Sequence, residues 1–408
     1  MRRIRTLSGL LAGLVVAATA LVAAATPAQA AALTQVASFG SNPGNLAMYA
    51  YRPDNLPTGA PAVVLLHGCA QDAAGYFTNS GWRKYADQWR FTLIVPEQRS
   101  ANNSSACFNW FETGDTSRGQ GEALSIKQMV DHARSNYGTA ANRVYVSGLS
   151  GGGAMSAAML ATYPDVFAAG SVIAGIPYRC ATGMVNAFSC MSPGVDKTPA
   201  QWGDLVRKAH PGYAGSRPRV AIWHGTADYT VAVANAVESR DQWTNVLGVS
   251  QTPTSTAQLP GGTSLEAYGN DAVRLYRVSG MGHGTPVNPG TGVDQCGSTA
   301  AYFLNTICSA YRDALFFGLD GGGTPSPTPS PTVTPSPTKT PGPTASPSPT
   351  GAPTCVTASN YAHVTAGRAY HSGGYAYANG SNQRMGLYNI FYTTTLRQIA
   401  ANHWTIGC

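Results

Sequence analysis

The chain has 408 residues and a formal charge of +7 at pH 7, but only 11% of its residues are charged. The basic residues are scattered along the sequence and form no cluster, which argues against a nucleic-acid partner. A surface with so few charges suits contact with an uncharged substrate.

The first 30 residues have the layout of a secretory signal peptide. Residues 1–5 are basic, residues 7–25 are rich in Ala, Leu and Val, and Pro-Ala-Gln-Ala at 27–30 provides a small-x-small cleavage site after Ala30. A membrane anchor is the competing interpretation, but the apolar run is alanine-rich and ends in a processing site. No later segment is apolar enough to span a bilayer. We therefore expect a secreted, extracellular protein without a membrane partner.

The eight cysteines are even in number, as complete pairing in an exported chain requires. Proximity along the sequence favours three pairs and elimination leaves the fourth. These pairs are Cys180–Cys190, Cys296–Cys308, Cys355–Cys408 and, by elimination, Cys69–Cys107. Free buried thiols are the alternative. No pair has CxxC spacing, so we expect no metal site.

Continuous apolar runs predict a mostly parallel sheet. An edge hairpin is expected over residues 33–56, where an alternating segment is halted by Pro53. Strands buried on both faces are expected at 62–68, 91–96, 219–225 and 273–278. Residues 121–137 predict an amphipathic helix. Because strands alternate with helices, we predict an α/β fold with a doubly wound sheet, which binds ligands at the carboxyl ends of its strands.

Ser150 lies in a Gly-x-Ser-x-Gly frame, between a segment of β-branched and aromatic residues and an Ala/Met-rich helical segment. A serine on so sharp a strand-to-helix turn needs glycines on either side, because the turn strains the backbone and the helix leaves no room for side chains. This geometry exposes the hydroxyl as a nucleophile. Alone the frame is weak evidence, since the chain contains 46 glycines and such frames arise by chance.

Two more residues that acyl transfer needs follow the last two predicted strands. Asp228 comes just after 219–225, and His283 comes just after 273–278 in a glycine-rich loop. Separately, such an Asp is often a helix cap and such a His a turn residue. The chain order Ser, Asp, His is that of α/β-hydrolases, in which His283 would activate Ser150 and Asp228 would orient His283. His224 precedes the loop, and we interpret it as structural.

The segments that carry this chemistry resemble the secreted polyhydroxybutyrate depolymerase family. The motifs are LHGCAQ (66–71), PEQ (96–98), CFNWF (107–111), GLSGGGAM (148–155), YPDVFAA (163–169) and GMGHGTPV (280–287). The resemblance implies an α/β-hydrolase with Ser150, Asp228 and His283 as its triad, and with the backbone amides of Cys69 and Gly151 as its oxyanion hole. The lipase box would lie in mid-chain. The same superfamily includes feruloyl and acetylxylan esterases.

The C-terminal part of the chain has a different composition. Residues 31–319 form the expected catalytic domain, and residues 320–354 are a Thr/Pro/Ser-rich linker. Residues 355–408, with a cysteine at each end, resemble the polymer-binding domain of many such depolymerases. Their motifs are CVTASNYAHV (355–364), GRAY (367–370), GSN (380–382) and GLYN (386–389). We expect some of the aromatics to adsorb to a hydrophobic polymer, and the candidates are Tyr375, Tyr377, Tyr388 and Trp404.

The leading hypothesis is a secreted serine esterase that hydrolyses polyhydroxybutyrate-type polyester through an acyl-enzyme, without metal or cofactor. The main alternative is a feruloyl or acetylxylan esterase whose last module binds plant polysaccharide. A binding protein with an inactive hydrolase domain is a third possibility, and the intact Ser, Asp and His argue against it. We expect the chain to act as a monomer on an insoluble polymer.

Overall fold

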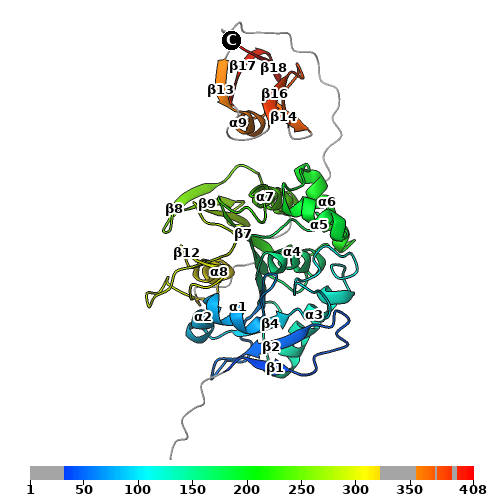
Figure 1. Ribbon diagram of the computed structural model, residues 1–408, viewed down its shortest axis with the longest axis vertical. Coiled ribbons are helices and arrows are strands. Elements are labelled where there is room, and N and C mark those ends of the chain that lie inside the picture. The colour runs from blue at the N-terminus through cyan, green and yellow to red at the C-terminus, as the bar shows by residue number, and fades with distance from the viewer. Residues whose placement is uncertain (1–31, 322–354, 373–374, 388–392) are drawn as a thin grey trace, which may run out of the picture.

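A computed structural model describes residues 32–321, 355–372, 375–387 and 393–408 (Figure 1). The predicted signal peptide, most of the predicted linker and Tyr388 lie outside these ranges. Within them, no helix combines the length and apolar character needed to cross a membrane.

A ten-stranded sheet runs through residues 32–321. Its strands in spatial order are β1 (Thr34–Val36), β2 (Ala47–Tyr51), β4 (Thr92–Glu97), β3 (Ala62–Leu66), β5 (Val144–Leu149), β6 (Ala169–Ile173), β7 (Arg219–Gly225), β10 (Val273–Val278), β9 (Thr263–Tyr268) and β8 (Ser255–Leu259). The strands from β4 to β10 in this order are parallel, and antiparallel pairs flank them at both edges. This pairing confirms the predicted α/β class. Sequence patterning did not identify β6, β8 and β9.

Helices cover both faces of the sheet (Figure 1). Alternate residues of β3 face opposite cores: Val64 packs in one cluster and Val63 in the other. On the first face lie α3 (Gly121–Tyr137), α4 (Gly151–Thr162), α6 (Pro199–Ala209) and α7 (Ala234–Leu247). On the second lie α1 (Ala73–Asn79), α2 (Trp82–Trp89) and α8 (Ser309–Phe317). This double covering explains why the central strands are continuous apolar runs.

Two short elements complete this body. After β10, the strands β11 (Thr285–Val287) and β12 (Phe303–Asn305) pair in parallel. The helix α5 (Met184–Met191) packs on a third apolar cluster, which also contains Trp110 and Val231.

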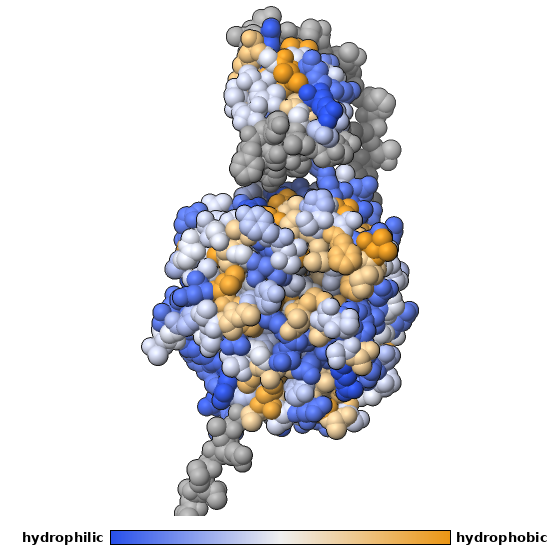
Figure 2. All heavy atoms as spheres, viewed as in Figure 1, coloured by the Kyte–Doolittle hydropathy of each residue, from blue (hydrophilic) through white to orange (hydrophobic). Residues whose placement is uncertain are grey.

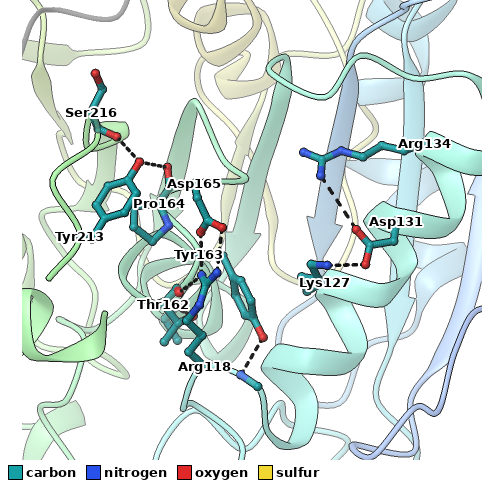
Figure 3. Close-up of polar contacts among 12 residues, drawn as sticks. Arg118, Lys127, Asp131, Arg134, Thr162, Tyr163, Pro164, Asp165, Tyr213 and Ser216 are labelled. Carbon is teal, nitrogen blue, oxygen red and sulfur yellow. Dashed lines mark hydrogen bonds and ion pairs between the residues drawn. The ribbon is translucent and has the colours of Figure 1, made fainter. Parts of the chain in front are cut away.

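The end of α4 that lies far from Ser150 is held by polar contacts (Figure 3). The Arg118 guanidinium donates two hydrogen bonds to the Asp165 carboxylate, at 2.6 and 2.8 Å, and a third to the Thr162 carbonyl. The Tyr163 hydroxyl accepts the backbone amide of Gly119 at 2.9 Å. A bidentate pair of this kind fixes geometry as well as charge. The YPDVFAA motif therefore anchors the helix whose other end follows Ser150.

The described residues of the segment 355–408 form two small antiparallel sheets and one helix. The elements are β13 (Cys355–Ser359), α9 (Asn360–Thr365), β14 (Ala369–Ser372), β15 (Tyr375–Ala378), β16 (Arg384–Leu387), β17 (Thr393–Ala400) and β18 (His403–Ile406). Their core is modest, and a Cys355–Cys408 disulfide joins the two ends. In so small a module, a bridge across the whole segment stabilises mainly by restricting the unfolded chain.

The prediction that Trp404 adsorbs to a polymer is wrong, because its side chain is buried. The Trp404 side chain is only 7% exposed and packs in the core of the module with Ala376 and Leu396. A ring enclosed in this way cannot meet a polymer surface. Tyr370, which sequence reasoning missed, is 40% exposed and stacks on Tyr377 across the β14–β15 pair, with ring centroids 5.4 Å apart.

The structure also contains the other three disulfides that proximity and elimination favoured. They are Cys69–Cys107, Cys180–Cys190 and Cys296–Cys308. No free cysteine is found in the described ranges, which include all eight cysteines of the chain.

Candidate active site

Ser150 stands on a strained turn between β5 and α4. Its φ of 56° and ψ of −117° are unusual for a residue with a side chain, and its backbone amide donates to the Ile173 carbonyl at 2.8 Å. The flanking glycines are required by close packing. A Cβ on Gly148 would collide with the Gly152 carbonyl, and a Cβ on Gly152 with the carbonyls of Leu66 and His67. The turn therefore has the features of a nucleophile elbow.

Asp228 and His283 are joined by a hydrogen bond across 55 residues of sequence. The Nδ1 atom of His283 lies 2.7 Å from Oδ2 of Asp228. Because an ionised carboxylate only accepts hydrogen bonds, Nδ1 carries the proton and the neutral ring presents Nε2 as an acceptor. This is the tautomer that a general base for serine needs.

The other carboxylate oxygen of Asp228 is held by its own loop. Oδ1 accepts the backbone amides of Thr230 and Val231, each at 2.9 Å. Burial by itself would raise the pKa of Asp228, but the hydrogen bond from His283 and the neighbouring backbone amide outweigh it and lower the pKa below its ordinary value. Asp228 therefore stays ionised and oriented at neutral pH.

His224 lies beneath this loop. It is fully buried, and its Nε2 donates to the Val231 carbonyl at 2.9 Å, while Oδ2 of Asp228 lies 3.5 Å away. Burial lowers the pKa of His224, so the ring remains neutral. These contacts agree with a structural role in which His224 shapes the loop that carries Asp228.

Ser150, Asp228 and His283 all follow parallel strands that are close together in the sheet. Strands β5, β6, β7 and β10 are consecutive neighbours, so their carboxyl ends share one edge. The loops after β7 and β10 are tied together by hydrogen bonds from Ala227 N to Met281 O and from Gly280 N to Thr226 Oγ1. These bonds hold the Asp228 loop against the His283 loop.

The two backbone amides expected to form the oxyanion hole belong to adjacent residues. A Cβ built on Gly151 would lie 3.1 Å from the Cys69 sulfur, so Cys69, in the loop after β3, lies against the first turn of α4. The first amides of a helix have no partner within the helix and favour negative charge. Gly151 therefore begins the helix directly after Ser150 with Cys69 beside it, and the oxyanion role of the two amides stays a prediction.

A buried histidine supports the loop that carries Cys69. His67 Nδ1 lies 2.8 Å from the Gly68 carbonyl, and His67 Nε2 accepts the Gln98 backbone amide at 3.1 Å. A carbonyl can only accept, so the two bonds select the neutral ring with its proton on Nδ1. Burial lowers the pKa of His67, which favours the same neutral form.

Glu122 at the start of α3 connects this support to the segment bonded to Cys69. Its carboxyl group accepts the Asn109 backbone amide at 2.9 Å and the Gln98 side-chain amide. Gln98 Nε2 also donates to the Cys107 carbonyl at 3.0 Å. Burial raises the pKa of Glu122 to about 8. Sequence reasoning gave Glu122 no role, and the only signal was that Gln98 and Cys107 fall in two of the family motifs.

The Cys69–Cys107 bridge should matter for catalysis because it joins the candidate oxyanion residue to this buried network. We expect Cys107→Ser to lower turnover of a soluble ester by about a hundredfold, the typical cost of losing one oxyanion donor, with a smaller change in KM. The matched control is Cys408→Ser, which also leaves one unpaired thiol but lies in the C-terminal module. Steady-state kinetics of the two variants make the comparison. Equal turnover in both would show that the bridge does not position the oxyanion amide.

No group of three or more His, Cys, Asp or Glu side chains is arranged to hold a metal ion in the described parts of the chain.

Comparisons with known proteins agree on one family. The family described as Esterase PHB depolymerase matches residues 46–265. The chain is 54% identical over 295 residues to poly(3-hydroxyalkanoate) depolymerase C of Paucimonas lemoignei, covering 71% of each protein. It is 40% identical over 261 residues to an acetylxylan esterase of Coprinopsis cinerea, covering 62% of this chain and 69% of that protein.

A solved structure agrees with the sequence comparisons. The acetyl xylan esterase from Aspergillus awamori matches with a TM-score of 0.61 and 29% identity, covering 71% of this chain and 99% of that one. Fold, family match and sequence identity lead to one conclusion: this chain belongs to the polyhydroxybutyrate depolymerase family of esterases and is an α/β-hydrolase of the serine type.

Proposed function

We propose that this protein is a secreted esterase that hydrolyses polyhydroxybutyrate-type polyester with Ser150, His283 and Asp228 as its catalytic triad. The observation that carries the proposal is the Asp228–His283 hydrogen bond, formed at the sheet edge where Ser150 occupies its strained turn. Nucleophile, base and orienting carboxylate are the groups that acyl transfer through a serine requires.

In the proposed reaction, Ser150 Oγ attacks the ester carbonyl carbon while Nε2 of His283 takes its proton. The Cys69 and Gly151 amides stabilise the negative oxygen of the tetrahedral intermediate. The imidazolium, stabilised by Asp228, then gives its proton to the leaving alkoxide, and the acyl group stays on Ser150. Water then attacks the acyl carbonyl carbon while Nε2 of His283 takes its proton, and the imidazolium returns that proton to Ser150 Oγ as the carboxylic acid leaves. These steps use only groups of the chain and need no cofactor.

Polyester is favoured over plant polysaccharide by the degree of similarity to named relatives. The identity is 54% to the poly(3-hydroxyalkanoate) depolymerase and 40% to the acetylxylan esterase. Feruloyl or acetylxylan ester hydrolysis is the second candidate, supported by the structural match to the acetyl xylan esterase from Aspergillus awamori.

The proposed organisation suits a solid substrate. Residues 1–30 would direct export, residues 31–319 would carry the catalysis, and residues 320–354 would tether the module 355–408. The four disulfides are consistent with an extracellular protein. A module that adsorbs to a granule keeps the tethered active site at high local concentration near the surface. Tyr370, Tyr375 and Tyr377 of the β14–β15 pair are its candidate contacts.

The test compares the purified chain with a form that ends after Gly321. We expect the full chain to clear a turbid polyhydroxybutyrate suspension and to release little acetate from acetylated xylan. The shortened form should keep its rate on a soluble butyrate ester, because every proposed catalytic residue precedes residue 321, but should lose most activity on granules. Faster release from xylan than from polyester would favour the second candidate. Equal granule rates for the two forms would show that the module is not an adsorption device.

A further inference from the structure

A group of large apolar side chains lies exposed on α5 and on the loop beside it. Met184 is 48% exposed, Val185 is 85% exposed and Phe188 is 66% exposed. Tyr229, the residue after Asp228, is 91% exposed. Figure 2 shows hydrophobic residues gathered on the upper right of the larger body, where Figure 1 places α5. We call Met184, Val185, Phe188 and Tyr229 the α5 face.

The helix has two apolar sides, and only one of them is used by the fold. Ala187 and Cys190 are buried in the third apolar cluster, and the Cys180–Cys190 disulfide ties the helix to the segment before it. Phe188 lies four residues after Met184 and three after Val185, so its side chain neighbours both on the surface of the helix. Internal packing therefore does not explain these three side chains. Exposed large apolar residues gathered in one place mark an interaction surface.

The helix α5 packs on the same apolar cluster as parts of the candidate active site. The cluster beneath α5 includes Trp110, whose ring lies 3.6 Å from the position of a Cβ on Gly151. The Asp228 loop joins the same cluster through Val231, and the amide of Ala232 donates to the Met191 carbonyl at 2.8 Å. These contacts attach α5 to the segments that carry Gly151 and Asp228, and Tyr229 of the α5 face directly follows Asp228 in the chain.

The charge pattern identifies the kind of partner. No charged residue occurs between Arg179 and Asp196, a segment that contains the whole of α5. Met184, Val185 and Phe188 offer no hydrogen bonds and only the Tyr229 hydroxyl does, so a hydroxyl-rich polysaccharide laid on this face would lose most of its contacts with water without replacement. An aliphatic polyester presents uncharged, largely apolar surface, which these side chains can cover favourably.

We propose that the α5 face is a second polyester-docking surface, which seats the catalytic body on the polymer so that a chain reaches Ser150. This inference rests on the proposed polyester substrate. The C-terminal module would bring the enzyme to the granule, and the α5 face would orient it there. If the two surfaces have these separate roles, substitutions in the α5 face should reduce the hydrolysis rate per adsorbed molecule more than they reduce adsorption.

The test uses the full chain with Val185→Ser and Phe188→Ser combined. The control is Val293→Ser, because Val293 is 56% exposed and its carbonyl accepts from Tyr85 of α2, on the other face of the sheet. Three quantities are measured: the amount adsorbed to a polyhydroxybutyrate film, the rate of film hydrolysis per adsorbed molecule, and the rate on a soluble butyrate ester. Melting temperatures check that the variants fold.

We expect the ratio of film rate to soluble-ester rate to fall on the order of tenfold in the double variant, since two apolar contacts are lost. Val293→Ser should keep the parental ratio, and Phe188→Leu, which retains apolar area, should keep most of it. A parental ratio in the double variant would overturn the docking role. An equal fall in the rates on film and on soluble ester would also overturn it, because α5 would then act only by stabilising the structure of the active site. Failure of the proposed function is a separate result: it is shown if the unmodified protein does not hydrolyse polyester film at all.

Discussion

Replacing Ser150 by alanine should lower ester turnover by about a millionfold, the usual scale for loss of a catalytic serine. The hydroxyl is needed for the covalent step, and no other described contact depends on it, because the turn is held by the Ser150 backbone amide and by the glycine contacts. The far end of α4 keeps its Arg118–Asp165 pair. We therefore expect an unchanged melting temperature and unchanged adsorption to polyester film.

The measurement is the steady-state rate on a soluble butyrate ester, with labelling by a fluorophosphonate as a second readout. Ser147→Ala is the matched control, because Ser147 lies on β5 and its buried hydroxyl has no hydrogen-bond partner in the described part of the chain. The control should retain activity and labelling. Turnover of Ser150→Ala within tenfold of the parent would rule out Ser150 as the nucleophile.

Replacing Asp228 by asparagine should lower turnover by about ten thousandfold. Oδ1 of Asp228 accepts two backbone amides, so the asparagine oxygen would remain there and its NH2 group would face His283. Two donors cannot share a hydrogen bond, so His283 would move its proton from Nδ1 to Nε2. A ring protonated on Nε2 cannot take the proton of Ser150.

This variant separates orientation from simple loss of a charge. Asp131→Asn is the control, because Asp131 pairs with Lys127 on the exposed side of α3 (Figure 3) and such surface pairs contribute little. Both variants are compared by kcat and KM on the soluble ester. A loss of less than about tenfold for Asp228→Asn would mean that another group orients His283.

Much of the fold follows from local patterns in the sequence. The apolar runs that become β3, β4, β7 and β10 are long enough to be identified as buried strands, and their alternation with helices implies a parallel sheet. The frame around Ser150 is predictable for the same reason, since the clash that excludes side chains at Gly148 and Gly152 arises within one tight turn. Strands β6, β8 and β9 were missed because their segments, AGSVI, STAQL and TSLEAY, mix polar and small residues with apolar ones and form no continuous apolar run.

The sequence indicated Asp228 and His283 as candidate catalytic residues but could not predict that they form a hydrogen bond. Their order along the chain and their positions after predicted strands are local facts, whereas the 2.7 Å bond between them depends on β7 and β10 being neighbours although β8 and β9 intervene in the sequence. The Glu122 network depends likewise on contacts between separate segments, because α3 must reach Gln98 and the Cys107 segment.

Exposure was decided by tertiary structure alone. Trp404 is an aromatic residue of the kind that adsorbs to polymers, but the module has few apolar side chains and encloses this ring in its core. Phe188 and Val185 resemble ordinary core residues in sequence, yet only the Ala187 side of α5 meets the rest of the fold. Residue type and spacing determined which strands, turn and chemical groups this chain contains. Tertiary structure decided which groups meet and which face water, because burial depends on what packs against each side of an element and not on the element's own sequence.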